Sequence, residues 1–84
     1  MYSVESEQLA LEQIAALPAE ALPFYAELMA MLETALWSGE AYNRQRPDAN
    51  MRTHAFGQHD QGLAIYLILG DQRRVIVLRV LWMG

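Results

Sequence analysis

The strongest constraint on this chain lies in residues 51–82, where three β-prone runs are joined by very short turns. The first run, MRTHAF, alternates as a half-solvated strand does and places Arg52, His54 and Phe56 on one face. The second, LAIYLIL, has no polar alternation, which predicts a central strand covered on both faces. Because turns as short as GDQR join only antiparallel neighbours, the runs predict an antiparallel meander. Its last strand, around Val75 to Leu81, is expected to be central.

The amino-terminal half predicts one short strand and two helices. The β-prone pair in MYSV indicates the strand, and Ser6 is placed to cap the first helix. Apolar residues at helical spacing indicate a second helix that begins near Ala19 or Pro23, because proline is tolerated in a first turn. Ser38 and Gly39 are expected to end this helix.

A strand and two helices followed by three strands predict an α+β fold (β-α-α-β-β-β). Its two amino-terminal helices pack on one face of a mostly antiparallel sheet. No repeat or change of composition marks a second domain, and 84 residues suit one small core, so a single domain is predicted over residues 1–84. The segment GEAYNRQRPDAN lacks periodicity and predicts the longest loop, with Arg44 and Arg46 exposed.

Charge is divided along the chain. Seven glutamates and no basic residue precede Arg44, whereas six arginines and three aspartates lie from Arg44 onward, within a net charge of -4. One interpretation is a basic surface that binds a partner or RNA through Arg44, Arg46, Arg73 and Arg74. The alternative is that arginines and glutamates solvate opposite sides of a small domain.

The residues offer little chemistry beyond arginine and histidine. There are no cysteines, the two histidines lack a third ligand at metal spacing, and no glycine-rich phosphate loop is present, so neither a metal nor a cofactor is expected. Arg52, His54 and Arg79 are the candidate catalytic residues, since arginines on a sheet could bind a phosphodiester while His54 acts as a general base. The alternative is that Arg79 points its head to water and that His54 is an ordinary surface histidine.

The apolar segments suit a partner better than a membrane. LAIYLIL is too short to cross a bilayer, and no basic segment precedes an apolar run near the amino terminus, so a cytoplasmic protein is expected. The hydrophobic fraction of 54% is high for a small chain, which favours a subunit or binding partner that covers part of the surface.

The order of elements and several motifs resemble the RelE/ParE superfamily of bacterial type II toxin–antitoxin toxins. The early run ALEQIAALP is similar to the family's first-helix pattern, with Ala10, Ile14, Leu17 and Pro18 at the matching positions. Tyr66 falls where the family's third-strand tyrosine lies, and VIVLRVL is similar to its fourth strand. The resemblance spans nearly the whole chain and implies an antitoxin partner, with the ribosome and mRNA or DNA gyrase as targets.

The departures from the family pattern concern its catalytic equipment. Leu63 stands where the family's third-strand arginine would lie, and Trp82 where a histidine follows the fourth strand; the family's later arginine or tyrosine is not reached. A toxin-fold protein that acts by protein contact is therefore the leading hypothesis. A diverged, non-toxic interaction or dimerisation protein is the alternative, and a ribosome-dependent mRNA interferase is third, so the expectation leans against an enzyme.

Overall fold

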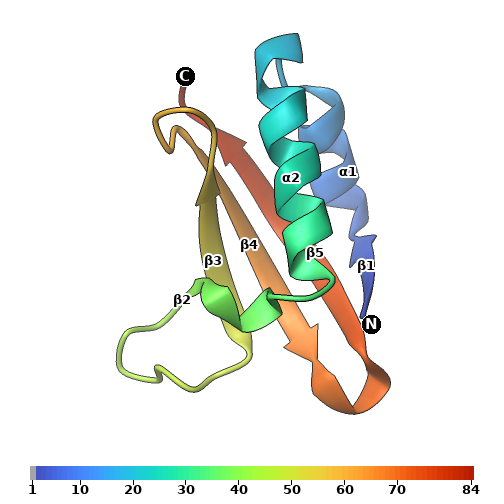
Figure 1. Cartoon of the computed structure of the whole chain (residues 1–84), viewed down its shortest axis with the longest axis vertical. Helices are drawn as coiled ribbons and strands as arrows, with labels where there is room; N and C mark the ends of the chain where they lie inside the picture. Colours follow the sequence, from blue (N-terminus) through green and yellow to red (C-terminus); the bar gives the residue numbers. More distant parts are fainter. Residues whose placement is uncertain (1) are drawn as a thin grey trace.

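The computed structural model describes residues 2–84, which form a five-stranded sheet with two helices on one face (Figure 1). Met1, the first residue of the MYSV run, lies outside the described residues. The principal elements are β1 (Ser3–Ser6), α1 (Gln8–Ala15), α2 (Leu22–Leu32), β2 (Glu40–Ala41), β3 (Met51–Phe56), β4 (Gly62–Leu69) and β5 (Arg74–Trp82). The strand order is β1-β5-β4-β3-β2, so the predicted α+β class is confirmed.

The antiparallel meander is formed by β3, β4 and β5, as predicted. β5 lies between β4 and β1, which confirms that the last strand is central. β1 makes the sheet mixed, because it pairs in parallel with β5 from Ser3 opposite Arg74 to Ser6 opposite Val77. The helices α1 and α2 carry the chain from β1 to β2 at the opposite edge of the sheet and cover one face of it (Figure 1).

The prediction that Ser6 caps α1 was wrong. Ser6 is the last residue of β1, and the backbone N–H of Glu7 still donates to the carbonyl of Val77, at 3.0 Å. Glu7 therefore occupies the N-cap position, without a side-chain capping bond. Strand pairing with β5 outweighs the local preference of serine for a cap.

The second helix begins where proline allows and ends earlier than predicted. A short 3-10 turn over Ala19–Ala21 leads into α2, with Pro23 in the first turn. α2 ends at Leu32, and a second 3-10 turn, Leu36–Ser38, then carries the chain toward β2. Across residues 2–84, no single helix is long and apolar enough to cross a membrane; α1 and Ala19–Leu32 pass that test only as a pair bent by 111°.

The core lies between the helices and one face of the sheet. Along β4, Ala64, Tyr66 and Ile68 are buried beneath the helices, while the residues between them are only partly buried. The prediction that this strand is covered on both faces was therefore wrong. Its uninterrupted apolar character reflects a face that no helix covers in the described part of the chain.

A β-bulge interrupts the pairing of β4 with β5. Ile65 lies opposite Arg79, but the next residue, Tyr66, lies opposite Val77, which leaves Leu78 as the extra residue. Near the bulge, the N–H of Val80 donates to the side-chain oxygen of Gln13, at 2.7 Å. α1 is thereby attached to the central strand by a polar contact as well as by packing.

Candidate functional site

The sheet surface turned away from the helices, called here the open face, carries mostly aliphatic side chains. The apolar residues that define it are Met51, Ala55, Leu63, Ile65, Leu67, Ile76, Leu78 and Leu81, all partly or largely exposed. Exposed apolar surface of this extent marks an interaction site more often than a free surface. The open face is thus the first candidate for function.

A hollow of about 280 Å³ lies on the open face. Met51, Ile65 and Leu78 give it apolar walls, and Glu7 and Arg79 bring one charge of each sign. Tyr42, from the loop after β2, also lines it. Sequence patterns did not indicate Glu7 or Tyr42, because each reaches the hollow only through pairing of distant strands.

Arg52 is buried on the helix side of β3. Its guanidinium donates to the carbonyl of Pro47 at 2.7 Å and to that of Gly39 at 2.5 Å. It also lies over the ring of Trp37, 5.2 Å from the centroid, while its Nε has no partner within the described residues. These hydrogen bonds hold Gly39, just before β2, and the loop between β2 and β3 against the sheet. With 9% of its surface exposed, Arg52 is not open to a phosphate.

Tyr66 is fully buried beside this arginine. Its hydroxyl donates to the carbonyl of Leu36, at 2.7 Å. Burial raises the pKa of Tyr66, and the positive charge of Arg52 partly opposes that rise. A Cβ atom on Gly39 would overlap the Tyr66 hydroxyl and the carbonyl oxygen of Thr53, so this close packing requires glycine. Tyr66 is therefore part of the core.

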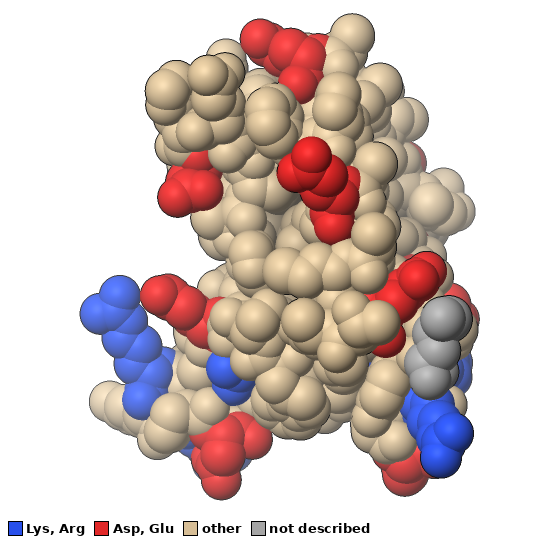
Figure 2. Space-filling model, in the orientation of Figure 1, with Lys and Arg blue, Asp and Glu red and all other residues tan. Residues whose placement is uncertain are grey.

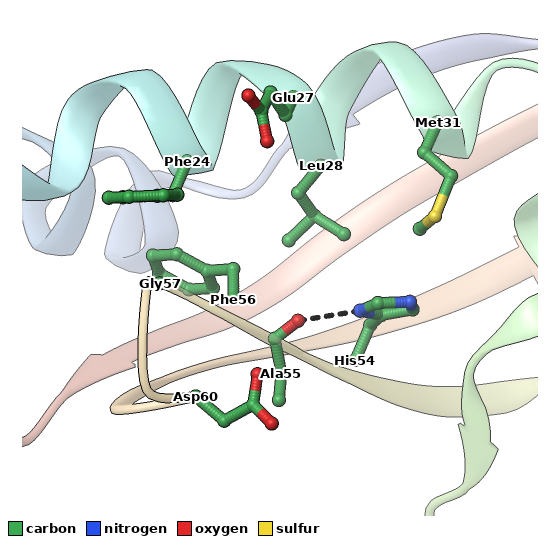
Figure 3. A pocket seen from close by; sticks show the side chains of 9 residues that line it. All are labelled: Phe24, Glu27, Leu28, Met31, His54, Ala55, Phe56, Gly57 and Asp60. Atoms are coloured by element: carbon green, nitrogen blue, oxygen red, sulfur yellow. Dashed lines mark hydrogen bonds between the residues drawn. The ribbon is translucent and has the colours of Figure 1, made fainter.

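His54 lies at the outer margin of the sheet, between α2 and the turn after β3 (Figure 3). Its Nδ1 is 2.6 Å from the carbonyl oxygen of Ala55. Because a carbonyl can only accept, this contact requires a proton on Nδ1. His54 is partly exposed.

The three candidate catalytic residues are not brought together. Arg52 and His54 project from the helix side of β3, whereas Arg79 belongs to the open face. The Arg79 guanidinium donates to the carbonyl of Leu78, at 2.8 Å, and is exposed. An RNase site that uses all three groups on one substrate is not assembled by this arrangement.

Three of the four candidate binding arginines lie in two loops, and Arg74 begins β5. Arg44 and Arg46 are exposed in the loop before β3, and Arg73, with φ of 51°, occupies the turn before β5. Figure 2 shows arginines at the end of the molecule where these loops lie, and carboxylates over the helices. The arginines thus form two clusters at one end rather than a basic sheet.

Arg74 is the member of this group with an acidic partner. Its guanidinium donates to both carboxylate oxygens of Glu5, at 2.6 and 2.9 Å, and to Gln72 at 2.7 Å. The hydrogen bond and charge of Arg74 lower the pKa of Glu5, and the same contact raises the pKa of Arg74. Arg74 therefore joins β1 to β5, and less of its charge is available to a partner.

The fold is that of the RelE-like toxins. The isolated Escherichia coli RelE toxin has a TM-score of 0.73 and 15% identity, with 100% of this chain and 86% of that chain covered. RelE in the E. coli RelBE toxin–antitoxin complex gives 0.70 and 15%, with coverage of 95% and 94%. The archaeal RelE–RelB complex from Pyrococcus horikoshii gives 0.69 and 13%, with coverage of 99% and 96%. No family model and no curated protein matches the sequence.

Proposed function

We propose that this chain is the toxin-fold component of a type II toxin–antitoxin module in the bacterial cytoplasm. In this proposal an antitoxin covers the open face and thereby keeps the protein from its target. The observation that carries the proposal is the extent of aliphatic surface on a sheet face without helical cover. The structural likeness to RelE chains that were solved in complex with RelB supports the same partner class.

Charge would guide the antitoxin rather than supply most of its affinity. Arg79 is exposed within the open-face hollow, and Arg44 and Arg46 are exposed in the loop before β3, so an acidic, amphipathic segment is the expected partner. An exposed ion pair contributes about 0–1 kcal/mol, so aliphatic anchors must provide most of the binding free energy. Added salt should then slow association more than it speeds dissociation.

The proposed mode of action is protein contact, with the ribosome or DNA gyrase as candidate targets. The burial of Arg52 and the separation of Arg79 from His54 support this choice over mRNA cleavage. A primer-extension assay with purified ribosomes checks it. Cleavage at defined codon positions that is lost in Arg79→Ala would instead support an mRNA interferase.

The antitoxin proposal is tested with two leucines of similar exposure. Leu81 on the open face is 41% exposed, and Leu11 on α1 is 50% exposed. We expect Leu81→Asp to weaken binding to the proposed acidic antitoxin, sought in the gene beside this one, by at least about tenfold, whereas Leu11→Asp leaves it unchanged. Equal losses in both variants would contradict the assignment of the open face.

The same face could be covered by a second copy of the chain, which is the alternative function of a dimerisation protein. Sedimentation of the purified protein with and without the neighbouring gene product distinguishes the two. A salt-insensitive homodimer that ignores that product, and is dissociated by Leu81→Asp, would replace the antitoxin proposal.

A further inference from the structure

A second surface feature lies at the outer margin of the sheet, between α2 and β3, and does not depend on the function proposed above. A pocket of about 220 Å³ opens there (Figure 3). Phe24, Leu28 and Met31 of α2 form one wall, and Phe56 of β3 faces them. The pocket is therefore apolar inside and lies beside a strand that has little sheet beyond it.

The edge of β3 beside this pocket has a backbone N–H without a partner among the described residues. The N–H of Ile68 in β4 donates to the carbonyl of Asn50, so the even-numbered residues of β3 direct their backbone N–H and C=O groups toward β4. The N–H of Tyr42 donates to the carbonyl of Met51, so the odd-numbered residues direct theirs toward β2. β2 pairs only as far as Thr53, because the chain before Glu40 leaves the sheet. Ala55 therefore directs its N–H outward, past the end of β2.

Another pocket lies on the other side of the same edge. It measures about 330 Å³ and is lined by Glu40, Thr53 and Leu63, among others. The two pockets share His54, Ala55 and Asp60, so they flank the unpaired edge from the helix side and from the open-face side. Both volumes are near or below the lower end of the roughly 300–1,000 Å³ of small-molecule sites, which suits single side chains better.

We propose that the edge at Ala55 binds an extended segment of a partner protein as an added strand. Successive side chains of a strand point to opposite faces, so neighbouring residues of the segment would enter the two pockets in turn. Its backbone carbonyl would accept from the N–H of Ala55. The backbone provides the affinity in this mode of recognition, and the pockets provide the selectivity.

Charge selects the kind of segment. Glu27 lines the helix-side pocket, Glu40 lines the open-side pocket, and Asp60 lines both. Among the described residues, neither lining includes an arginine or lysine. Basic side chains can lay their stems on an apolar wall while their heads reach a carboxylate. The segment should therefore alternate aliphatic and basic residues, opposite in charge to the segment expected on the open face.

The probe is a capped synthetic pentapeptide of alternating leucine and arginine, titrated into the isotope-labelled protein and followed by amide NMR. We expect saturable shifts centred on Ala55 and Gly57. A peptide with glutamate in place of arginine should bind at least about tenfold more weakly. The arginine peptide with an N-methylated central residue, which disturbs the added strand's backbone pairing, should also bind less well.

Variants of the protein test each part of the groove separately. Ala55→Pro removes the outward N–H at an edge position where proline is tolerated, and should weaken binding at least about tenfold. The pair Glu27→Gln and Asp60→Asn should weaken it about 3–10-fold; asparagine suits the positive φ of 55° at Asp60. If Ala55→Pro fails to fold, the N-methylated peptide on the unaltered protein decides the role of the backbone.

Three results would overturn the inference. They are the absence of saturable binding by the arginine peptide, equal affinity for the glutamate peptide, and shifts centred on Ile65 and Leu67. The last of these would assign the basic peptide to the open face instead.

Discussion

The two faces of the sheet are built from the same kinds of residue but have different surroundings. On β4, Ile68 is 2% exposed beneath the helices, whereas Ile65, three residues earlier on the same strand, is only partly buried on the open face. On the helix side, Arg52 and Tyr66 donate hydrogen bonds to backbone carbonyls. Aliphatic composition alone therefore does not distinguish a core from a binding surface; the position of the helices does.

The largest expected difference between the faces is in packing. Ile68→Ala should lower the free energy of unfolding by about 3–5 kcal/mol, because it leaves a cavity in the core. Ile65→Ala, the matched change on the open face, should lower it by about 1 kcal/mol. Urea denaturation of both variants measures the difference. Similar losses would show that the open face is packed as tightly as the core.

The next largest effect concerns arginine. Arg52→Ala should lower the free energy of unfolding by about 2–3 kcal/mol, because two carbonyls lose a charged donor near the core. Arg79→Ala should change it by less than about 0.5 kcal/mol, since that side chain is exposed. Thermal unfolding of the two variants gives the comparison. A large loss for Arg79→Ala alone would reverse the roles given to the two faces.

A smaller effect is expected for the tyrosines. Tyr66→Phe should lower the free energy of unfolding by about 1–2 kcal/mol, because the carbonyl of Leu36 loses its buried donor. Tyr42→Phe, in an exposed loop position, should be neutral within error. Chemical denaturation again measures both. A neutral Tyr66→Phe would mean that water can replace the lost hydroxyl.

The smallest effect is the pH dependence of the Glu5–Arg74 pair. Because this contact lowers the pKa of Glu5 in the folded state, its contribution to stability is present above the ordinary value of 4.5. That contribution is lost as the pH falls through the lowered value. Glu5→Gln should remove this part of the acid dependence, which unfolding curves recorded between neutral and acid pH would show. If the free energy of unfolding of Glu5→Gln changed with pH in parallel with that of the unaltered protein, the pair would have no role in acid stability.

The strands of the meander could be predicted because their signals are local. MRTHAF, LAIYLIL and RVIVLRVLW alternate or run apolar between short turns, and the observed β3, β4 and β5 match them closely. β2 was missed because two residues carry no period and pair only where Thr53 offers an edge. The end of α2 was placed too late, because Ala35 has helical propensity but adopts φ of -118° and ψ of 44°.

The candidate site was less predictable because it depends on which face the helices cover. Alternation placed Arg52 and His54 together on one face, and the structure agrees, but it could not show that this face turns inward. The partners of Arg52 are backbone carbonyls at Gly39 and Pro47, which no side-chain pattern reveals. Arg79 was expected to join them. The extra residue of the β-bulge, Leu78, shifts the alternation along β5 by one position, so Arg79 lies on the opposite face.

The parallel pairing of β1 with β5 also bears on how the protein is made. The partner residues of β1 are synthesised about 70 residues after it, so the first strand has no place in the sheet until translation has passed Val77. Contacts this distant in sequence slow folding, because a long loop must close before the pair forms. Until then the aliphatic strands lack the cover of the completed sheet.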